Sequence, residues 1–205
     1  MNTYETAAVK DTEKLALKLL KEIGISCSAS NTYAITDVDI TTDTNKKIDV
    51  QYSNNFAKYG DFRVDIVSAF VYERTTEGQT NHNNEILNKF EEANRCTVEK
   101  AGKIFQPNYV DFLIVFFYDD MYQKDTTENI LIIKVSELHN YINQNAEGLF
   151  RQIKINDKRR YNLPDRHGSA FLPIKVCDLK KNCTCFFGTW DELLNQKDNI
   201  IEYIN

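Results

Sequence analysis

The chain contains few of the residues from which nucleotide-binding loops are built. Only seven of its 205 residues are glycine, and neither a G-x-x-x-x-G-K-[ST] nor a G-x-G-x-x-G sequence occurs. Such loops need glycine where the backbone approaches a phosphate, so this scarcity nearly excludes a Gly-rich nucleotide site. A G-x-S-x-G elbow and an H-E-x-x-H helix are also absent. The common serine hydrolases and zinc metalloproteases are therefore poorly supported.

Long apolar runs are missing as well. No segment approaches the roughly 20 apolar residues that a membrane-spanning helix needs. The polar start of the sequence, Met1-Asn-Thr-Tyr-Glu, has no signal-peptide character. We therefore expect an intracellular, cytoplasmic protein with no membrane partner. The richness in Asn, Lys and Ile is typical of an AT-rich genome, which leaves a phage or viral source open.

Cysteine is present in an odd number that does not suggest a disulfide framework. Without secretory context, reduced thiols are the default for the five residues, which are Cys27, Cys96, Cys177, Cys183 and Cys185. The last three, with His167 nearby, raise the alternative of a zinc site. Their C-x(5)-C-x-C spacing matches no common paired-ligand pattern, and their neighbours are partly apolar, which favours simple packing. The pair Cys183 and His167 also raises the alternative of a thiol enzyme, which nothing else in the sequence supports.

Length and composition favour one soluble domain. A chain of 205 residues can form one sizeable core but is short for two independent domains. Hydrophobic residues make up 42% and charged residues 27%, which is the usual range for soluble globular proteins. No internal repeat, low-complexity tract or clear linker is visible. We expect a single domain over residues 1–205.

Negative charge predominates overall, but positive charge is concentrated near the C-terminus. The formal net charge is −5, which argues mildly against a nucleic-acid partner. Residues 151–181, however, contain nine basic and three acidic side chains, so this segment is +6 and the remainder −11. Such a patch is able to grip a phosphate backbone, and the candidate nucleic-acid-binding residues are Lys158, Arg159, Arg160 and Arg166. The alternative is an ordinary solvated loop face.

Hydrophobic periodicity predicts alternating helices and strands. A helix over 6–23 with Gly24 as its stop comes first. Residues 73–84 have almost no apolar content and read as a loop. The remaining predictions are strands at 62–72, 110–118 and 129–135, an extended segment at 171–176, and helices at 85–101, 136–145 with Ser136 as N-cap, and 189–203.

The most informative segment is a predicted β-hairpin over residues 35–52 that carries acidic residues on both arms. Apolar and polar residues alternate on each arm, and the middle of the segment is polar. Asp39 on the first arm and Asp49 on the second are expected to lie close together. Gln51 is two residues beyond Asp49 and therefore shares its face of the strand. Asp is also common in hairpin turns, so a purely structural role is the competing interpretation.

Paired carboxylates of this kind suit a hard divalent cation. Mg²⁺ or Mn²⁺ takes one or two carboxylates together with waters and a substrate phosphate. Asp39 and Asp49 would then serve phosphodiester chemistry.

The residues after the hairpin strengthen this interpretation through a resemblance. The run from Ile48-Asp-Val-Gln-Tyr to Gly60-Asp-Phe-Arg-Val-Asp resembles the core of the PD-(D/E)XK, or restriction-endonuclease-like, nuclease superfamily. The resemblance implies an α/β fold with a restriction-endonuclease-like central mixed β-sheet flanked by helices. It spans about residues 8–143, followed by a basic C-terminal extension over about 151–205.

One departure from the family pattern concerns its lysine, which is thought to orient the attacking water and to stabilise charge on the phosphate. Gln51 stands at that position and carries no charge, so Lys58 or Arg63 could supply the cation. The resemblance also makes Glu13, on the first helix, a weak candidate metal ligand, although solvent exposure is the simpler explanation. A further alternative is a scaffold that has lost catalysis.

The sequence therefore yields two hypotheses. The first is a metal-dependent deoxyribonuclease, an endonuclease in preference to an exonuclease, with Asp39 and Asp49 on the metal, Gln51 positioning water, and DNA as substrate. A homodimer is plausible, because cutting both strands of a duplex is simplest with two copies related by a twofold axis. The second is a catalytically inactive protein of the same fold that binds nucleic acid or a protein partner.

Overall fold

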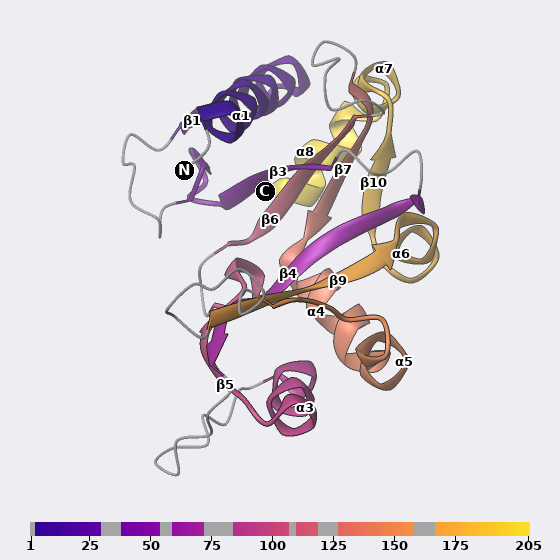
Figure 1. The fold of residues 1–205 in the computed structure, drawn as a ribbon. Coiled ribbons are helices and arrows are strands. Elements are labelled where there is room, and N and C mark those ends of the chain that lie inside the picture. Colours follow the sequence, from indigo (N-terminus) through magenta and orange to yellow (C-terminus); the bar gives the residue numbers. More distant parts are fainter. Residues whose placement is uncertain are drawn as a thin grey trace. The chain divides into compact units, whose positions relative to one another are not determined.

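The computed structural model describes residues 3–29, 38–53, 59–71, 84–106, 110–118, 127–157 and 167–205. It is an α/β structure with a mixed sheet and helices (Figure 1). Its contacts divide the chain into two compact units, each assembled from separate stretches of sequence. Unit 1 comprises Met1–Asp61, Asn108–Glu137 and Val176–Asn205, and unit 2 comprises Phe62–Pro107 and Leu138–Lys175. One domain for the whole chain stays a prediction.

Unit 1 is built on a six-stranded mixed sheet. Its strands are, in spatial order, β1 (Cys27–Ala29), β2 (Ile40–Thr42), β3 (Lys47–Ser53), β6 (Phe112–Tyr118), β7 (Thr127–Lys134) and β10 (Cys185–Gly188). The pair β3 and β6 is parallel, and the other neighbouring pairs are antiparallel. The central strand β6 has the sequence FLIVFFY and is buried from Phe112 to Phe117. A continuous apolar run is what a strand covered on both faces requires.

One face of this sheet forms the hydrophobic core of unit 1. Leu19 and Leu20 of α1 (Thr3–Ile23) belong to the same buried cluster as Ile48 and Val50 of β3. Helices α7 (Trp190–Leu194) and α8 (Lys197–Ile204) complete the cover, and Leu193, Ile200 and Ile204 are fully buried there. The predicted stop at Gly24 is confirmed: its φ is +103°, and its N–H donates to the Leu20 carbonyl at 3.0 Å.

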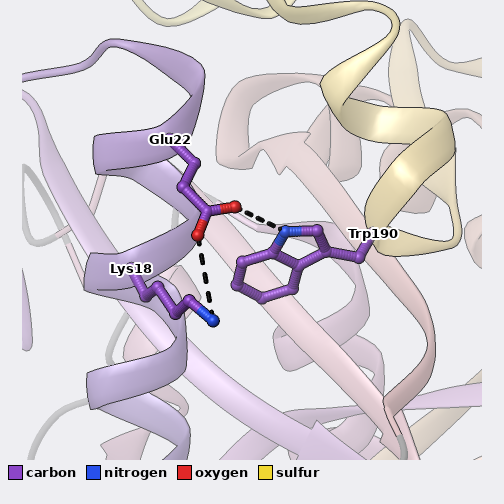
Figure 2. A network of polar contacts seen from close by, with 3 residues as sticks. All are labelled: Lys18, Glu22 and Trp190. Carbon is purple, nitrogen blue, oxygen red and sulfur yellow. Dashed lines mark hydrogen bonds and ion pairs between the residues drawn. The ribbon is translucent and has the colours of Figure 1, made fainter.

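A polar contact joins two of these helices near the surface of unit 1. The indole Nε1–H of Trp190 donates to Glu22 Oε2 at 2.8 Å, and Lys18 Nζ lies 3.8 Å from Glu22 Oε1 (Figure 2). The same ammonium is 5.4 Å from the centre of the Trp190 ring. Glu22 lies near the start of the sequence and Trp190 near its end, so the contact links α1 to α7.

Unit 2 contains a four-stranded sheet in the order β5 (Thr97–Ala101), β4 (Asp61–Val71), β9 (His167–Lys175) and β8 (Lys154–Asp157). Helices α3 (Glu85–Asn94) and α5 (Ala146–Phe150) and most of α4 (Val135–Gln144) belong to it, together with the short 3-10 helix η1 (Lys103–Phe105). Buried residues alternate with more exposed ones along residues 168–175 of β9 and along residues 62–66 of β4. This second sheet was not anticipated, because β4 was expected to belong to one central sheet.

The helix predicted over 85–101 is wrong in its second half. Helix α3 ends at Asn94, where Arg95 adopts a left-handed backbone with φ +49°. The next residues form β5, and Val98 donates its N–H to Glu91 Oε1 at 2.7 Å. The helical pattern of apolar residues continues in the sequence beyond Asn94. The backbone of residues 97–101 nevertheless pairs with β4, and this tertiary pairing outweighs the local helical preference.

Two helix predictions in the second half of the chain need correction. The helix expected over 189–203 is two helices, α7 and α8, separated at residues 195–196, with Thr189 capping the first. Helix α4 begins at Val135, so Ser136 lies inside it instead of capping it. Residues 176–205, which fall in the expected basic C-terminal extension, supply α6 (Val176–Asn182), β10, α7 and α8 to unit 1.

Candidate functional site

The predicted hairpin is present in unit 1. Ile40 pairs with Ile48 and Thr41 with Lys47, in antiparallel register. The turn is closed by Asn45, which has φ +60° and donates its N–H to the Thr42 carbonyl at 2.9 Å. The Thr42 hydroxyl accepts the Lys46 N–H at 3.0 Å. Residues 35–37 of the predicted first arm lie outside the described residues.

Asp49 and Gln51 share one face of β3, as strand alternation predicted. Gln51 Nε2 donates to Asp49 Oδ2 at 2.7 Å. Their neighbours Ile48 and Val50 belong to the core cluster, so the two polar side chains project from the opposite face of the sheet. Asp49 is only 1% exposed. Ser53, next on this face, is also buried, and sequence reasoning did not single it out.

Asp39 reaches the second arm through its carboxylate. Asp39 Oδ2 accepts the backbone N–H of Val50 at 2.7 Å. The hairpin therefore brings Asp39 to the peptide that joins Asp49 to Val50. The side chain of Asp39 takes the place of a backbone acceptor just where the β2 ladder stops. The predicted closeness of the two segments is confirmed, and the shared cation stays a prediction.

The parallel partner of β3 gives the polar pair an apolar setting. In register, Asp49 faces Leu113 and Gln51 faces Val115, and both β6 residues are fully buried. At the start of the pairing Lys47 N–H donates to Asp111 Oδ2 at 2.8 Å. Asp111 is exposed, and its carboxylate extends the ladder by one bond.

A second acidic residue of unit 1 is buried away from the hairpin turn. Asp61 opens β4 and is 8% exposed. It follows Gly60, which has φ +62° and whose carbonyl accepts the Val176 N–H at 3.2 Å. The sequence signal for it was the Gly60-Asp61 pair, although it was not proposed as a ligand.

The other predicted catalytic residues are distributed over both units or are not described. Glu13 lies half-buried on α1 in unit 1. Arg63 lies on β4 in unit 2, with its guanidinium carbon 5.1 Å from the centre of the Phe171 ring. Lys58 lies outside the described residues, and so do the predicted nucleic-acid-binding residues Lys158, Arg159, Arg160 and Arg166.

The donors fit a magnesium or manganese ion in type but form no larger cluster. Over the described ranges, no group of three or more His, Cys, Asp or Glu side chains could hold a metal ion. Two carboxylates and an amide at the hairpin are nevertheless within what Mg²⁺ uses, because it retains several waters. A metal ion would have little access to the Asp49 carboxylate, since this residue is nearly covered.

The cysteines suggested for zinc are free thiols. Cys183 Sγ lies 3.8 Å from the Glu137 carbonyl oxygen. Burial, with smaller contributions from Cys185 and Glu137, raises the pKa of the Cys183 thiol to about 11. Burial also raises the pKa of Cys185. Thiols held in the protonated form are weak nucleophiles and weak metal ligands.

Among the helices that the structure describes, none is long and apolar enough to cross a membrane.

Comparison with protein-family models, with curated proteins and with solved structures found no match to this chain.

Proposed function

We propose that the protein is a metal-dependent deoxyribonuclease, an endonuclease, of the PD-(D/E)XK type. The observation that carries this proposal is the convergence at the hairpin. Asp39 contacts the peptide next to Asp49, and Gln51 contacts the Asp49 carboxylate. Three oxygen-bearing side chains, two from β3 and one from the residue before β2, thus lie at this hairpin of unit 1.

The order of elements also supports the proposal. Helix α1 is followed by the antiparallel strands β1, β2 and β3, and β6 then pairs in parallel with β3. A mixed sheet with helices is what the resemblance implies. The acidic strand β3 lies in the interior of this sheet, between β2 and β6, where its backbone is held on both sides. A rigid strand of this kind positions catalytic side chains better than a loop does.

Asp39 and Asp49 would hold Mg²⁺ or Mn²⁺, with Glu13 as a further candidate ligand. When bound, such an ion lowers the pKa of a coordinated water and offsets negative charge on a phosphate.

Gln51 would position water while remaining bonded to Asp49. Its amide nitrogen donates to Asp49 Oδ2, so its amide oxygen is the group that accepts a hydrogen bond from water. It supplies no positive charge. Lys58 or Arg63 would supply the missing cation, and the guanidinium carbon of Arg63 lies 5.1 Å from the centre of the Phe171 ring.

Charge distribution supports DNA as the substrate. Counted over the sequence, unit 2 has thirteen basic and ten acidic residues, a net +3, whereas unit 1 has twelve and twenty, a net −8. Lys158, Arg159, Arg160 and Arg166 belong to the positive unit, and we propose that they contact phosphates. A homodimer would place two sites on the two strands of a duplex.

The test is a nuclease assay on single-stranded, duplex and branched DNA with Mg²⁺ and with Mn²⁺. We expect metal-dependent cleavage that Asp49→Asn abolishes, because the neutral amide is a poor ligand for a hard cation. Asp43→Asn is the matched control, since Asp43 lies exposed in the turn of the same hairpin. Cleavage by the Asp49 variant at the wild-type rate, or no cleavage of any substrate, would reject the proposal.

The burial of Asp49 favours a second candidate, a protein of this fold that binds nucleic acid or a protein without cutting. A carboxylate that is 1% exposed and already bonded to Gln51 also suits a purely structural role. Mn²⁺ titration followed by electron paramagnetic resonance separates the two candidates. Stoichiometric binding lost in Asp49→Asn supports the nuclease, and no binding supports the second candidate.

A further inference from the structure

We propose that the outward face of the sheet in unit 2 is a binding platform for single-stranded nucleic acid. The inference concerns binding, and it holds whether or not Asp49 supports cleavage. It starts from the strict alternation of burial along β9. Gly168, Ala170, Leu172 and Ile174 are buried, whereas Ser169, Phe171, Pro173 and Lys175 are half-buried or exposed. One face of the strand packs inward, and the other remains partly open.

The neighbouring strands extend this open face. In β8, Lys154 pairs with Phe171 and Asn156 with Ser169, and side chains directly opposite each other lie on the same face. Lys154 and Asn156 are both exposed. From β4, Arg63 contributes the guanidinium that lies 5.1 Å from the centre of the Phe171 ring, while Phe62 and Val64 beside it are buried.

The chemistry of this face matches a single strand. It presents an aromatic ring with a guanidinium over it, a lysine opposite the ring and two small polar side chains. Bases of unpaired strands stack on aromatic rings and on arginine planes, and positive side chains follow the phosphates. Asn156 and Ser169 offer hydrogen bonds to base edges or sugars. A duplex hides its base faces, so it cannot use the ring and the guanidinium in this way.

Charge around the platform is compatible with a polyanion. The acid of β4 on this side, Asp65, accepts a hydrogen bond from the Ser68 hydroxyl at 2.6 Å and lies near Lys100 and Lys103. Its negative charge is therefore offset locally. The unit as a whole is +3, in contrast to the −8 of unit 1. Because unit 2 carries a net positive charge, it attracts a polyanion such as nucleic acid.

The test measures fluorescence anisotropy of a labelled oligothymidylate and of a duplex of equal length, with EDTA present so that cleavage is excluded. We expect the single strand to bind more tightly than the duplex. Phe171→Leu keeps an apolar side chain but removes the ring, and it should weaken single-strand binding by about fivefold or more. Lys154→Ala should weaken binding and reduce the salt slope by about 0.7.

Arg63→Lys separates stacking from charge, because it keeps the positive charge and removes the planar group. We expect it to weaken single-strand binding. Lys21→Ala is the matched control, since Lys21 is an exposed lysine on α1 in unit 1, and it should bind like wild type.

Three results would overturn the proposal: equal or tighter binding of the duplex, an unchanged affinity of Lys154→Ala, or an equal loss in Lys21→Ala. Circular dichroism of each variant verifies folding. If Phe171→Leu does not fold, the exposed Lys154 and Arg63 variants decide the question.

Discussion

Gln51 donates its side-chain N–H to the Asp49 carboxylate at 2.7 Å, within a single strand and on the face opposite the core. The bond explains how a nearly covered carboxylate is tolerated, because a buried charge needs a hydrogen-bonding partner. Gln51 also stands at the position where the resemblance implies a lysine.

Gln51→Lys should increase DNA cleavage if the proposed nuclease is limited by the missing cation. A fixed positive charge beside the carboxylate stabilises charge that develops on the phosphate, and we expect a rise of about tenfold or more in the cleavage rate. Tyr52→Lys is the control, because it adds the same charge to the next residue of β3, whose side chain is partly exposed on the other face. An equal rise in both variants would contradict a local effect at Asp49.

Trp190→Phe should destabilise unit 1 by about 1 kcal/mol, because it removes the donor of the hydrogen bond to Glu22. Lys18→Ala should cost less, since its ion pair with Glu22 is 3.8 Å long and the lysine side chain is 66% exposed (Figure 2). Urea unfolding followed by circular dichroism measures both changes. A larger loss in the lysine variant would contradict the prediction, because the Lys18–Glu22 ion pair lies within α1, whereas the indole bond joins α1 to α7.

The stability of unit 2 should fall as the pH drops below about 6.5. Burial lowers the pKa of His139, against a smaller opposing effect of its hydrogen bond to the Ile104 backbone. The unfolded chain therefore binds the proton more readily, so acid favours unfolding. His139→Phe should lose less stability in acid, because a ring stacked on Phe105 is retained without a titrating group. Unfolding by urea at neutral and acidic pH tests this, and parallel losses in both proteins would contradict it.

Alkaline conditions should destabilise unit 1. Burial raises the pKa of Tyr203 to about 12, and its hydroxyl donates to the Thr184 carbonyl at 2.6 Å. Because the folded protein holds this proton more tightly than the unfolded chain, stability is fully present below about pH 10 and is lost as the pH rises towards about 12. Tyr203→Phe should be less stable at neutral pH, since the Lys134 N–H and the Thr184 carbonyl lose a partner. Its alkaline loss should be smaller, as measured by the urea midpoint at each pH.

Two glycines of unit 2 should respond in opposite ways to alanine. A Cβ on Gly102 would lie 1.7 Å from the Asp65 carbonyl oxygen, and backbone cannot yield easily, so Gly102→Ala should cost more than about 2 kcal/mol. A Cβ on Gly148, in α5, meets nothing within 4 Å, so Gly148→Ala should stabilise by about 0.5–1 kcal/mol. Urea unfolding compares the two. Similar values for both variants would contradict the close approach of residues 65 and 102.

Local patterns predicted most of the elements near the candidate site. Strand alternation placed Asp49 and Gln51 on one face, and the polar centre of 35–52 predicted the turn between β2 and β3. Gly24 was correctly expected to end α1. These features depend on residues close in sequence, whose geometry is set by the backbone period. The helix predicted over 85–101 was half wrong because β5 forms only against β4, a partner about thirty residues away.

The sequence by itself determined the α/β class, the acidic hairpin and the concentration of positive charge. Its periodicity and composition act through local backbone geometry and burial, which any fold of this chain must respect. Only the tertiary structure decided that β4 joins a second sheet, that residues 176–205 complete the first, and that Arg63 lies over Phe171. Those outcomes depend on which distant strands pair, and the free energy of that pairing comes from contacts that no single segment contains.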